Sequence, residues 1–534
     1  TPQFKAWLED DQEVIVVDIR ESHELKLGYA DGALLIRMND VPNRLDELPD
    51  KNTRLVVYCA AGMKKPAEAV AANYRKEYGV QVNFQFGGTV ALLSQIENAP
   101  RGDLFIAADE HAIGLAREKG LIEETLPLAY QYPVIAVQAG NPKNVRGFED
   151  LFRDDLRVAV GNKETASIGK ATRAVLGERW EELLAKVAVT KTTVMELAAD
   201  LSFGAVDAAV IWNSTVPQFS KLEAVEVEHF TTHKDKVTVS VLKASGVSAS
   251  ALKFARYLNA PGKGSAVFSA MKFEAIAGDE WAEKPVLVLY SGGVNRPAVS
   301  ETLKEFASRE GVTVDTMFNG CGVLCAAMQA MNDTSNPRFP DAYYACDLCF
   351  VPPVEESFPE AVMLTQTVIG IAVPKGNPKN IRTLADLGGP ELKVGINNAQ
   401  QSTLGFMTAG MLKQSALEEA VRRNVRAEVP TADLLINQIR TGSLDAVVVY
   451  EVNYKLAEEY LDFIRIDHEG ARAVQPFAVR VDSPRRLLGA RLLAFMQKNR
   501  ARFEASGFTW IEDQTPVKSS ELEIPPWLLK PTKP

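Results

Sequence analysis

The 534-residue chain has few cysteines and histidines, no long apolar run and no excess of positive charge. No stretch approaches the ~18 uninterrupted apolar residues of a membrane-spanning helix, so no span is predicted. The net charge of −10 argues against a nucleic-acid surface, which would be basic and clustered. It does not argue against a small anion, because backbone N–H groups and helix N-termini bind anions whatever the total charge.

The chain also lacks a recognisable catalytic constellation. The five histidines are scattered, and only His229 and His233 have ligand-like spacing, within polar sequence typical of exposed loops. No Ser-His-Asp arrangement and no pair of carboxylates stands out. Asp109 and Asp347 each follow a predicted strand, where an aspartate more commonly caps the next helix. The residues alone therefore predict neither an enzyme nor a cofactor.

What the chain does have is an internal duplication. Three segments occur twice in the same order: DLFIAAD at 103–109 and DAYYACD at 341–347, GNPKN at 140–144 and 376–380, and GAVDAAVIW at 204–212 and GSLDAVVVY at 442–450. The offsets of 238, 236 and 238 residues keep the spacing almost constant. A period this long indicates duplicated domains, because solenoid repeats have periods of ~20–50 residues.

Each repeat opens with the pattern of a parallel α/β sheet. In the first repeat the predicted strands are Arg54–Cys59, Val80–Phe86 and Leu104–Ala107, with a helix over Ala67–Tyr78 that Gly79 ends. The second repeat starts the same order at Val286–Tyr290. Strands that alternate with helices predict a parallel sheet covered by helices.

Apolar segments and proline-rich stretches set the predicted boundaries. Segments 133–137 and 367–373 are expected to cross between two lobes, and 279–285 is the expected linker. The predicted domains are a segment at 1–52 outside the duplication, binding domains at 53–280 and 285–512, and a proline-rich tail at 513–534.

Both repeats resemble type 2 periplasmic substrate-binding proteins, nearest to the molybdate- and tungstate-binding group of ABC importers. The resemblance is carried by Phe86-Gly87-Gly88-Thr89, by 102–109, by Gly140-Asn141-Pro142 and by 204–208, and it covers most of the chain. It implies two lobes per unit around a cleft, a small oxyanion ligand, and an ABC permease as membrane partner. It also implies a periplasmic or otherwise extracytoplasmic location, with a signal peptide expected to have been removed.

In that family, serine hydroxyls, backbone N–H groups at helix N-termini and a tyrosine hold the oxyanion between the lobes. The resemblance implies ligand contacts at Gly62, Thr89, Ser167, Thr193 and Trp212 in the first repeat, and at Ser291, Gly293, Cys321, Ser402, Thr431 and Tyr450 in the second. Thr89 is the only one of the two serine positions before the lobe crossing that keeps a hydroxyl in the first repeat. In the second repeat the matching position holds Cys321, whose thiol is a weak hydrogen-bond donor. These departures leave the identity of the ligand open. A structural or sensory protein with degenerate clefts is the other binding-class alternative.

The first 52 residues resemble the first half of a rhodanese domain, on Val17-Asp18-Ile19-Arg20-Glu21 and on 28–33. The segment at 56–64 also resembles the rhodanese active-site loop, with Cys59 at the nucleophile position. The same residues open the first binding domain, and the second repeat has its own first strand without such a segment. We therefore assign 53–98 to the binding domain, and keep a Cys59-dependent sulfurtransferase as the alternative function.

The other four cysteines, Cys321, Cys325, Cys346 and Cys349, lie only in the second repeat. Two disulfides, such as Cys321–Cys346 and Cys325–Cys349, suit an exported protein. A metal site with all four thiolates as ligands is the sharper alternative, because the spacings are compatible with metal ligation. Free thiols are the third possibility.

Overall fold

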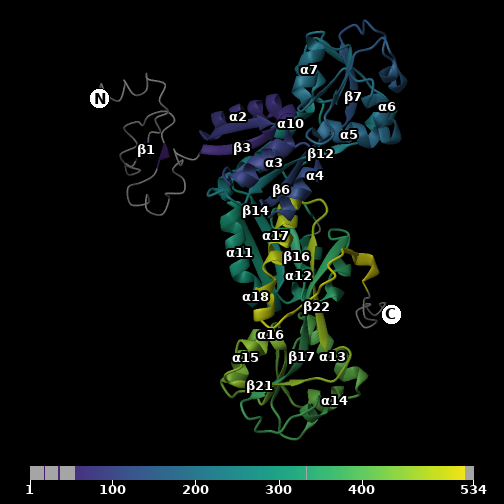
Figure 1. Ribbon diagram of the computed structural model, residues 1–534. Coiled ribbons are helices and arrows are strands. Elements are labelled where there is room, and N and C mark those ends of the chain that lie inside the picture. Colours follow the sequence, from purple (N-terminus) through teal and green to yellow (C-terminus); the bar gives the residue numbers. More distant parts are fainter. Residues whose placement is uncertain (1–16, 19–33, 36–53, 332, 523–534) are drawn as a thin grey trace.

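The computed structural model describes residues 17–18, 34–35, 54–331 and 333–522. The protein is α/β and consists of two units in tandem, each with two lobes. We call the lobe that holds a unit's first strand its near lobe and the other its far lobe. The two near lobes meet in the middle of an elongated molecule, and the far lobes lie at opposite ends (Figure 1).

The near lobe of the first unit is built on a six-stranded sheet in the order β13-β6-β12-β5-β3-β4. Its strands are β3 (Arg54–Ala60), β4 (Gln81–Gly87), β5 (Leu104–Ala107), β6 (Ile122–Gln131), β12 (Asp235–Leu242) and β13 (Glu274–Ala275). Its helices are α2 (Lys64–Tyr78), α3 (Thr89–Asn98), α4 (Glu110–Glu118), α9 (Ser248–Asn259) and α10 (Gly264–Ala270). As predicted, β3 pairs in parallel with β4 and β5. Side chains alternate across the sheet, so Val57 joins one buried cluster and Tyr58 the other.

The far lobe of the first unit has a five-stranded sheet in the order β11-β7-β10-β8-β9. Its strands are β7 (Pro133–Gln138), β8 (Val158–Gly161), β9 (Val189–Lys191), β10 (Ala208–Trp212) and β11 (Leu222–Val225). Its helices are α5 (Ser167–Leu176), α6 (Trp180–Leu184), α7 (Val194–Ser202) and α8 (Glu228–Thr231). The predicted crossing segment 133–137 lies wholly in this lobe, and the chain crosses at Tyr132, between β6 and β7.

In the second unit the two lobes share one eleven-stranded sheet. Its strands are β14 (Val286–Gly292), β15 (Thr313–Asn319), β16 (Ala342–Tyr344), β17 (Glu360–Pro374), β18 (Val394–Asn397), β19 (Val425–Val429), β20 (Ala446–Tyr450), β21 (Leu461–Arg465), β22 (Arg472–Val479), β23 (Thr509–Trp510) and β24 (Val517–Lys518). The long strand β17 pairs with β22 in the near lobe and with β20 in the far lobe, and it contains the predicted crossing segment 367–373.

Among the described residues the second unit has eight α-helices, one fewer than the first. They are α11 (Arg296–Glu310), α12 (Cys321–Met331), α13 (Thr403–Gln414), α14 (Glu418–Arg422), α15 (Ala432–Arg440), α16 (Glu451–Lys455), α17 (Arg486–Lys498) and α18 (Arg500–Ala505). Short 3₁₀ helices are η4 (Ala61–Met63), η5 (Phe148–Phe152), η6 (Gly177–Arg179) and η7 (Val216–Gln218) in the first unit, and η8 (Gly293–Asn295), η9 (Leu348–Phe350), η10 (Pro352–Val354), η11 (Ala385–Gly388) and η12 (Ser519–Glu521) in the second.

Ahead of the first unit, β1 (Val17–Asp18) pairs in parallel with β2 (Leu34–Leu35). The structure describes only these four of the first 52 residues, and the end of the predicted tail from 523 onward also lies outside the described residues.

The backbone of the GNPKN turns shows that the duplication is structural. At 140–144 and 376–380 the glycine φ is 82° and 81°, the first asparagine φ is 45° and 46°, and the second is 50° and 48°. In each turn the first asparagine's amide donates to the carbonyl four residues on, at 2.7 Å in both. Left-handed φ values favour glycine and asparagine, so the sequence pattern and the conformation agree.

The two near lobes are joined by a buried ion cluster at the end of α11. Glu310 is 1% exposed and accepts hydrogen bonds from Arg491 (Nε to Oε1, 2.6 Å) and from Arg256 of the first unit (Nη1 to Oε2, 3.1 Å). Arg256 also donates to the Glu310 carbonyl at 2.8 Å. In the predicted linker, Asp279 accepts from the N–H groups of Leu487 and Leu488 and thereby caps α17.

Candidate functional site

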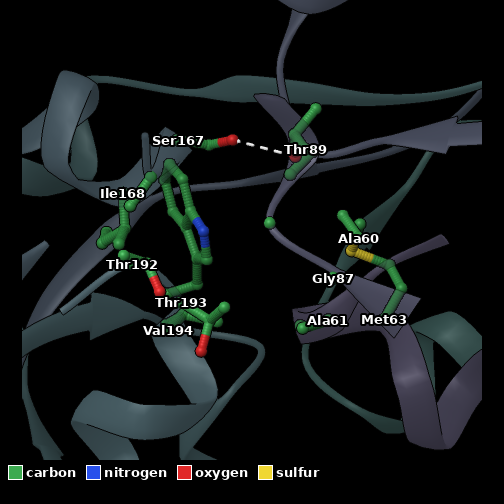
Figure 2. Close-up of a pocket in the computed structure, with 15 residues that line it drawn as sticks. Ala60, Ala61, Met63, Gly87, Thr89, Ser167, Ile168, Thr192, Thr193 and Val194 are labelled. Carbon is green, nitrogen blue, oxygen red and sulfur yellow. Dashed lines mark hydrogen bonds between the residues drawn. The ribbon is translucent and has the colours of Figure 1, made fainter. Parts of the chain in front are cut away.

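A small cavity lies between the lobes of the first unit. Near-lobe residues 60–63 and 87–89 line one side, and far-lobe residues 166–168 and 192–194 line the other, together with Trp212 (Figure 2). The cavity volume is about 30 Å³, which is room for a ligand of only a few atoms.

Three α-helices begin at this cavity. The first residues of α3, α5 and α7 all line it, and η4 leads into α2 beside them. The first N–H groups of a helix have no intrahelical partner and carry a partial positive charge. Gly88 and Ala166 are the N-cap residues of α3 and α5, and neither makes a side-chain hydrogen bond to its helix. Among the described residues, no lysine, arginine or histidine lines the cavity, so the donors it can offer are backbone N–H groups, hydroxyls and the Trp212 indole N–H.

Two predicted site residues meet across the lobes. The Ser167 hydroxyl of the far lobe lies 3.1 Å from that of Thr89 in the near lobe (Figure 2). Ser167 also donates to a carboxylate oxygen of Asp109, whose other oxygen accepts from the N–H of Ala112 at 2.8 Å and caps α4. The sequence indicated the cap but not the contact between Asp109 and Ser167, because that contact depends on how the lobes close.

The other predicted residues of the first unit also line the cavity. A Cβ added to Gly62 would lie 3.2 Å from the Val194 side chain, so glycine here lets the two lobes approach closely. The Thr193 hydroxyl is used in a capping box with Glu196, which directs it to the helix. Trp212 ends β10 and is buried.

A matching cavity of about 20 Å³ lies between the lobes of the second unit. The predicted residues Gly293, Ser402, Thr431 and Tyr450 line it. The first residues of α15 and Leu404 of α13 do so too.

Ser291 and Cys321 were expected to contact the ligand of the second unit, but they do not line its cavity. Both are fully buried. The Ser291 hydroxyl lies 3.4 Å from the Asn295 amide, and Cys321 contacts Cys346. Cys346, two residues after the end of β16, lines the cavity in their place.

Polar side chains that sequence reasoning missed also line the second cavity. They are Asn319, Asp433 and Asn453. Asn319 stands immediately before the glycine that precedes α12, as Gly87 does before the glycine that precedes α3. The Tyr450 hydroxyl is buried without a hydrogen-bond partner among the described residues, as is the Thr403 hydroxyl. Burial raises the pKa of Tyr450 well above its usual value, so this hydroxyl is a neutral donor.

The cysteine cluster of the second unit contains free thiols. Cys321 Sγ and Cys346 Sγ lie 2.8 Å apart, whereas Cys325 donates to the Phe350 carbonyl at 3.3 Å. Among the described residues, no three cysteine, histidine or carboxylate side chains are placed to hold a metal ion. The four-cysteine metal site considered from the sequence is therefore not formed.

Cys59, the alternative nucleophile, lies inside the near-lobe sheet of the first unit. Its strand pairs with β4 on one side and β5 on the other, and the side chain is fully buried. Burial raises the pKa of Cys59 well above its ordinary value, and Glu68 adds to the effect. Because the thiolate is the nucleophilic form, this environment suppresses reactivity.

A partly buried carboxyl at the start of β12 predicts a pH effect on stability. Burial, with Asp109 and Glu110 nearby, raises the pKa of Asp235 to about 7, and His233 lies 3.8 Å away. A carboxyl whose pKa is raised by folding destabilises the native state once the pH exceeds its pKa in the unfolded chain, near 4. The destabilisation reaches its full size above pH 7, where the carboxyl is ionised in both states. Asp235→Asn should therefore be more stable than wild type by about 2 kcal/mol at pH 8, a difference that disappears at pH 4. Urea unfolding at both pH values tests this, and a constant difference would contradict it.

Comparisons with known proteins agree with this architecture. The chain matches the bacterial extracellular solute-binding protein family over residues 55–271 and again over 287–509. Two lobes around a cavity, in duplicate, define a solute-binding protein. The chain belongs to that family and carries two copies of its domain. Residues 1–93 match the rhodanese-like domain, so 55–93 are shared by both matches.

The curated relatives are of two kinds, binding proteins and sulfurtransferases. A putative binding protein of Haemophilus influenzae is 26% identical over 36% of this chain and 79% of its own length. Molybdate-binding protein ModA of Mycobacterium tuberculosis is 32% identical over 23% of this chain, which spans about half (47%) of that relative. Putative sulfurtransferase YtwF of Bacillus subtilis is 32% identical over 17% of this chain and 84% of its own length.

A solved substrate-binding domain of a putative molybdenum ABC transporter from Clostridium difficile is 26% identical to this chain. The match covers 42% of this chain and 99% of that one, with a TM-score of 0.35. No helix within the described ranges has the length and apolar character needed to cross a membrane.

Proposed function

We propose that this protein binds a small, fully deprotonated oxyanion of the molybdate type in the cleft of each unit and delivers it to an ABC-type permease. The observation that carries the proposal is the meeting of three α-helix N-termini at a cavity that no cationic side chain lines. Helix N-termini offer N–H donors and a positive dipole end, which suit an anion whose oxygens only accept hydrogen bonds. In the second unit, Ala432 at the start of α15 lines the corresponding cavity, as do Gly320 before α12 and Ser402 before α13, together with Asp433.

The donor set favours one class of oxyanion. Gly62, Thr89, Ser167 and Val194 present N–H groups or hydroxyls, and no carboxylate lines the first cavity. Hydrogenphosphate carries a proton that needs an acceptor, so molybdate, tungstate and sulfate fit better. We place the ligand contacts at the cavity-lining residues, and we keep the predicted domains at 1–52, 53–280 and 285–512. An extracytoplasmic location follows from the proposed role as the binding component of an importer.

Thermal unfolding in the presence of oxyanions tests the proposal. A ligand at 100 times its Kd stabilises the native state by about 2.7 kcal/mol. Molybdate or tungstate should raise the melting temperature in a dose-dependent way, and phosphate at equal ionic strength should not. An unchanged melting temperature with every oxyanion would favour degenerate clefts instead.

A second candidate function, sulfur transfer by Cys59, is favoured by the rhodanese-like match. The burial of Cys59 and its raised pKa oppose it. We expect the protein to show no thiosulfate:cyanide turnover above that of a Cys59→Ser variant, measured as thiocyanate release. Turnover in the wild type that the substitution abolishes would reverse this assignment.

A further inference from the structure

Two thiols lie side by side in the wall of the second cleft. Cys321 is the first residue of α12 and Cys346 follows β16, with their sulfur atoms 2.8 Å apart. The N–H of Cys346 also donates to Cys321 Sγ at 2.9 Å. A Cβ added to Gly292 would lie 2.3 Å from Cys346 Sγ, so glycine at this position makes room for the sulfur.

This pair is confined to the second unit. At the corresponding positions the first unit has Thr89 and Ala108, and it carries no other cysteine than Cys59. Cys346 lines the second cavity, whereas Cys325 and Cys349 do not. A change in the pair therefore reaches one cleft and leaves the other untouched.

We propose that Cys321 and Cys346 are a reversible dithiol–disulfide site that controls the second cleft, with a hydroperoxide as the oxidant. Control of ligand binding rests on the proposed function, whereas formation of the disulfide does not. The pair occupies a helix N-terminus, where the dipole favours a thiolate. Burial opposes ionisation, but hydrogen bonds from Cys346 and Tyr343 outweigh it and lower the pKa of Cys321.

The reaction balances without any further reagent. A thiolate of the pair attacks the hydroperoxide and breaks its O–O bond, which gives a sulfenic acid and an alkoxide. The remaining thiol protonates the alkoxide to an alcohol. The thiolate so formed attacks the sulfenic sulfur and displaces hydroxide, which takes a proton to become water. The two thiols lose two electrons in total and the hydroperoxide gains them.

Oxidation would change the cavity wall at Cys346. The sulfur would turn toward Cys321, because a disulfide requires about 2.05 Å between the sulfur atoms. The thiol that now lines the cavity would be lost as a donor, and the first residues of α12 would shift with Cys321. The second cleft, but not the first, should then lose affinity for its anion.

Disulfide mapping of the full-length protein tests the site. After treatment with hydrogen peroxide, the free thiols are alkylated in denaturant and the peptides are analysed by mass spectrometry. We expect one disulfide, between Cys321 and Cys346, which dithiothreitol reverses, while Cys59, Cys325 and Cys349 remain alkylated. Cys325→Ser should keep this disulfide, and Cys346→Ala should abolish it. No disulfide in the wild type, or one that uses Cys325 or Cys349, would overturn the proposal.

Calorimetric titration with molybdate tests the control of the cleft. The reduced protein should bind at two sites and the peroxide-treated protein at one. Cys321→Ser cannot form the disulfide but keeps the Cys346 thiol in the cavity wall, so its binding should be insensitive to peroxide. Equal stoichiometry and affinity before and after oxidation would show that the disulfide does not control molybdate binding in the second cleft. If molybdate binds at neither site, the proposed function fails, while the disulfide map still decides whether the thiols react.

Discussion

Replacing Glu310 by alanine is expected to lower the stability of the near lobes by about 3–5 kcal/mol, the cost of leaving buried charges without a partner. The Arg256 and Arg491 side chains are only 6% and 9% exposed, and both form ion pairs with Glu310. Two Arg256 nitrogens, Nε and Nη2, are already buried without hydrogen-bond partners. Removal of the carboxylate would leave both cations uncompensated at the contact between the two units.

Calorimetric unfolding measures the loss, together with amide exchange of α9, α11 and α17. The melting temperature of the near lobes should fall by about 10 °C. Glu123→Gln is the matched control, because the Lys498–Glu123 pair also bridges the units but is partly exposed. Exposed pairs contribute only about 0–1 kcal/mol. Equal effects of the two substitutions would show that the Glu310 cluster does not hold the units together.

A substitution of the whole cluster separates charge from packing. Arg256→Met, Glu310→Leu and Arg491→Met together should restore most of the stability that Glu310→Ala loses, because buried ion clusters can be replaced by apolar side chains of similar volume. The cluster thus lies where the near lobes meet, away from the far lobes at the two ends of the molecule (Figure 1).

Local patterns in the sequence predicted the parts of the fold that local chemistry decides. The GNPKN turns contain the glycine and asparagine that left-handed backbone favours, and both adopt it. Asp109 and Asp347 cap the helices that follow them, as their positions after a strand indicated. The capping box of α7 was also present as Thr193 with Glu196 three residues later, although sequence reasoning assigned that threonine to the ligand.

One difference between the units has a cause that is visible in the sequence. The Ile369 N–H donates to the Ala471 carbonyl at 2.9 Å and keeps β17 continuous. The first unit has Pro133 at this position, 236 residues earlier, and proline has no N–H to donate. The strand is therefore divided there into β6 and β7, and the single sheet becomes two.

Contacts across the cleft could not be predicted from the sequence. The meeting of Ser167 with Asp109 depends on the angle between the lobes, which no local periodicity encodes. Ser291 lies within β14 and Cys321 begins α12, and both side chains turn into the core. The backbone positions that form each cavity were therefore easier to predict than the side chains that enter it.

Substitution of Val194 by proline should remove molybdate binding from the first cleft with little effect on the fold. Val194 is the first residue of α7, where proline is tolerated because that N–H makes no intrahelical bond. The preceding Thr193 already has the extended backbone that proline requires, with φ −132° and ψ 149°. The substitution therefore deletes one N–H donor beside the cavity and little else.

Ala432, the first residue of α15, provides the same substitution in the second unit, after Thr431 with φ −138° and ψ 147°. A hydrogen bond to a charged group contributes about 1.5–3 kcal/mol, so each proline should weaken its own site by roughly 10- to 150-fold. Calorimetric titration should show one of two sites lost in each variant and both lost in the double variant. Thr193→Ala, which keeps the N–H, should bind within a few-fold of wild type. If both prolines leave molybdate affinity unchanged while the variants stay folded, the anion does not bind at the helix N-termini, and the ligand site lies elsewhere in the protein.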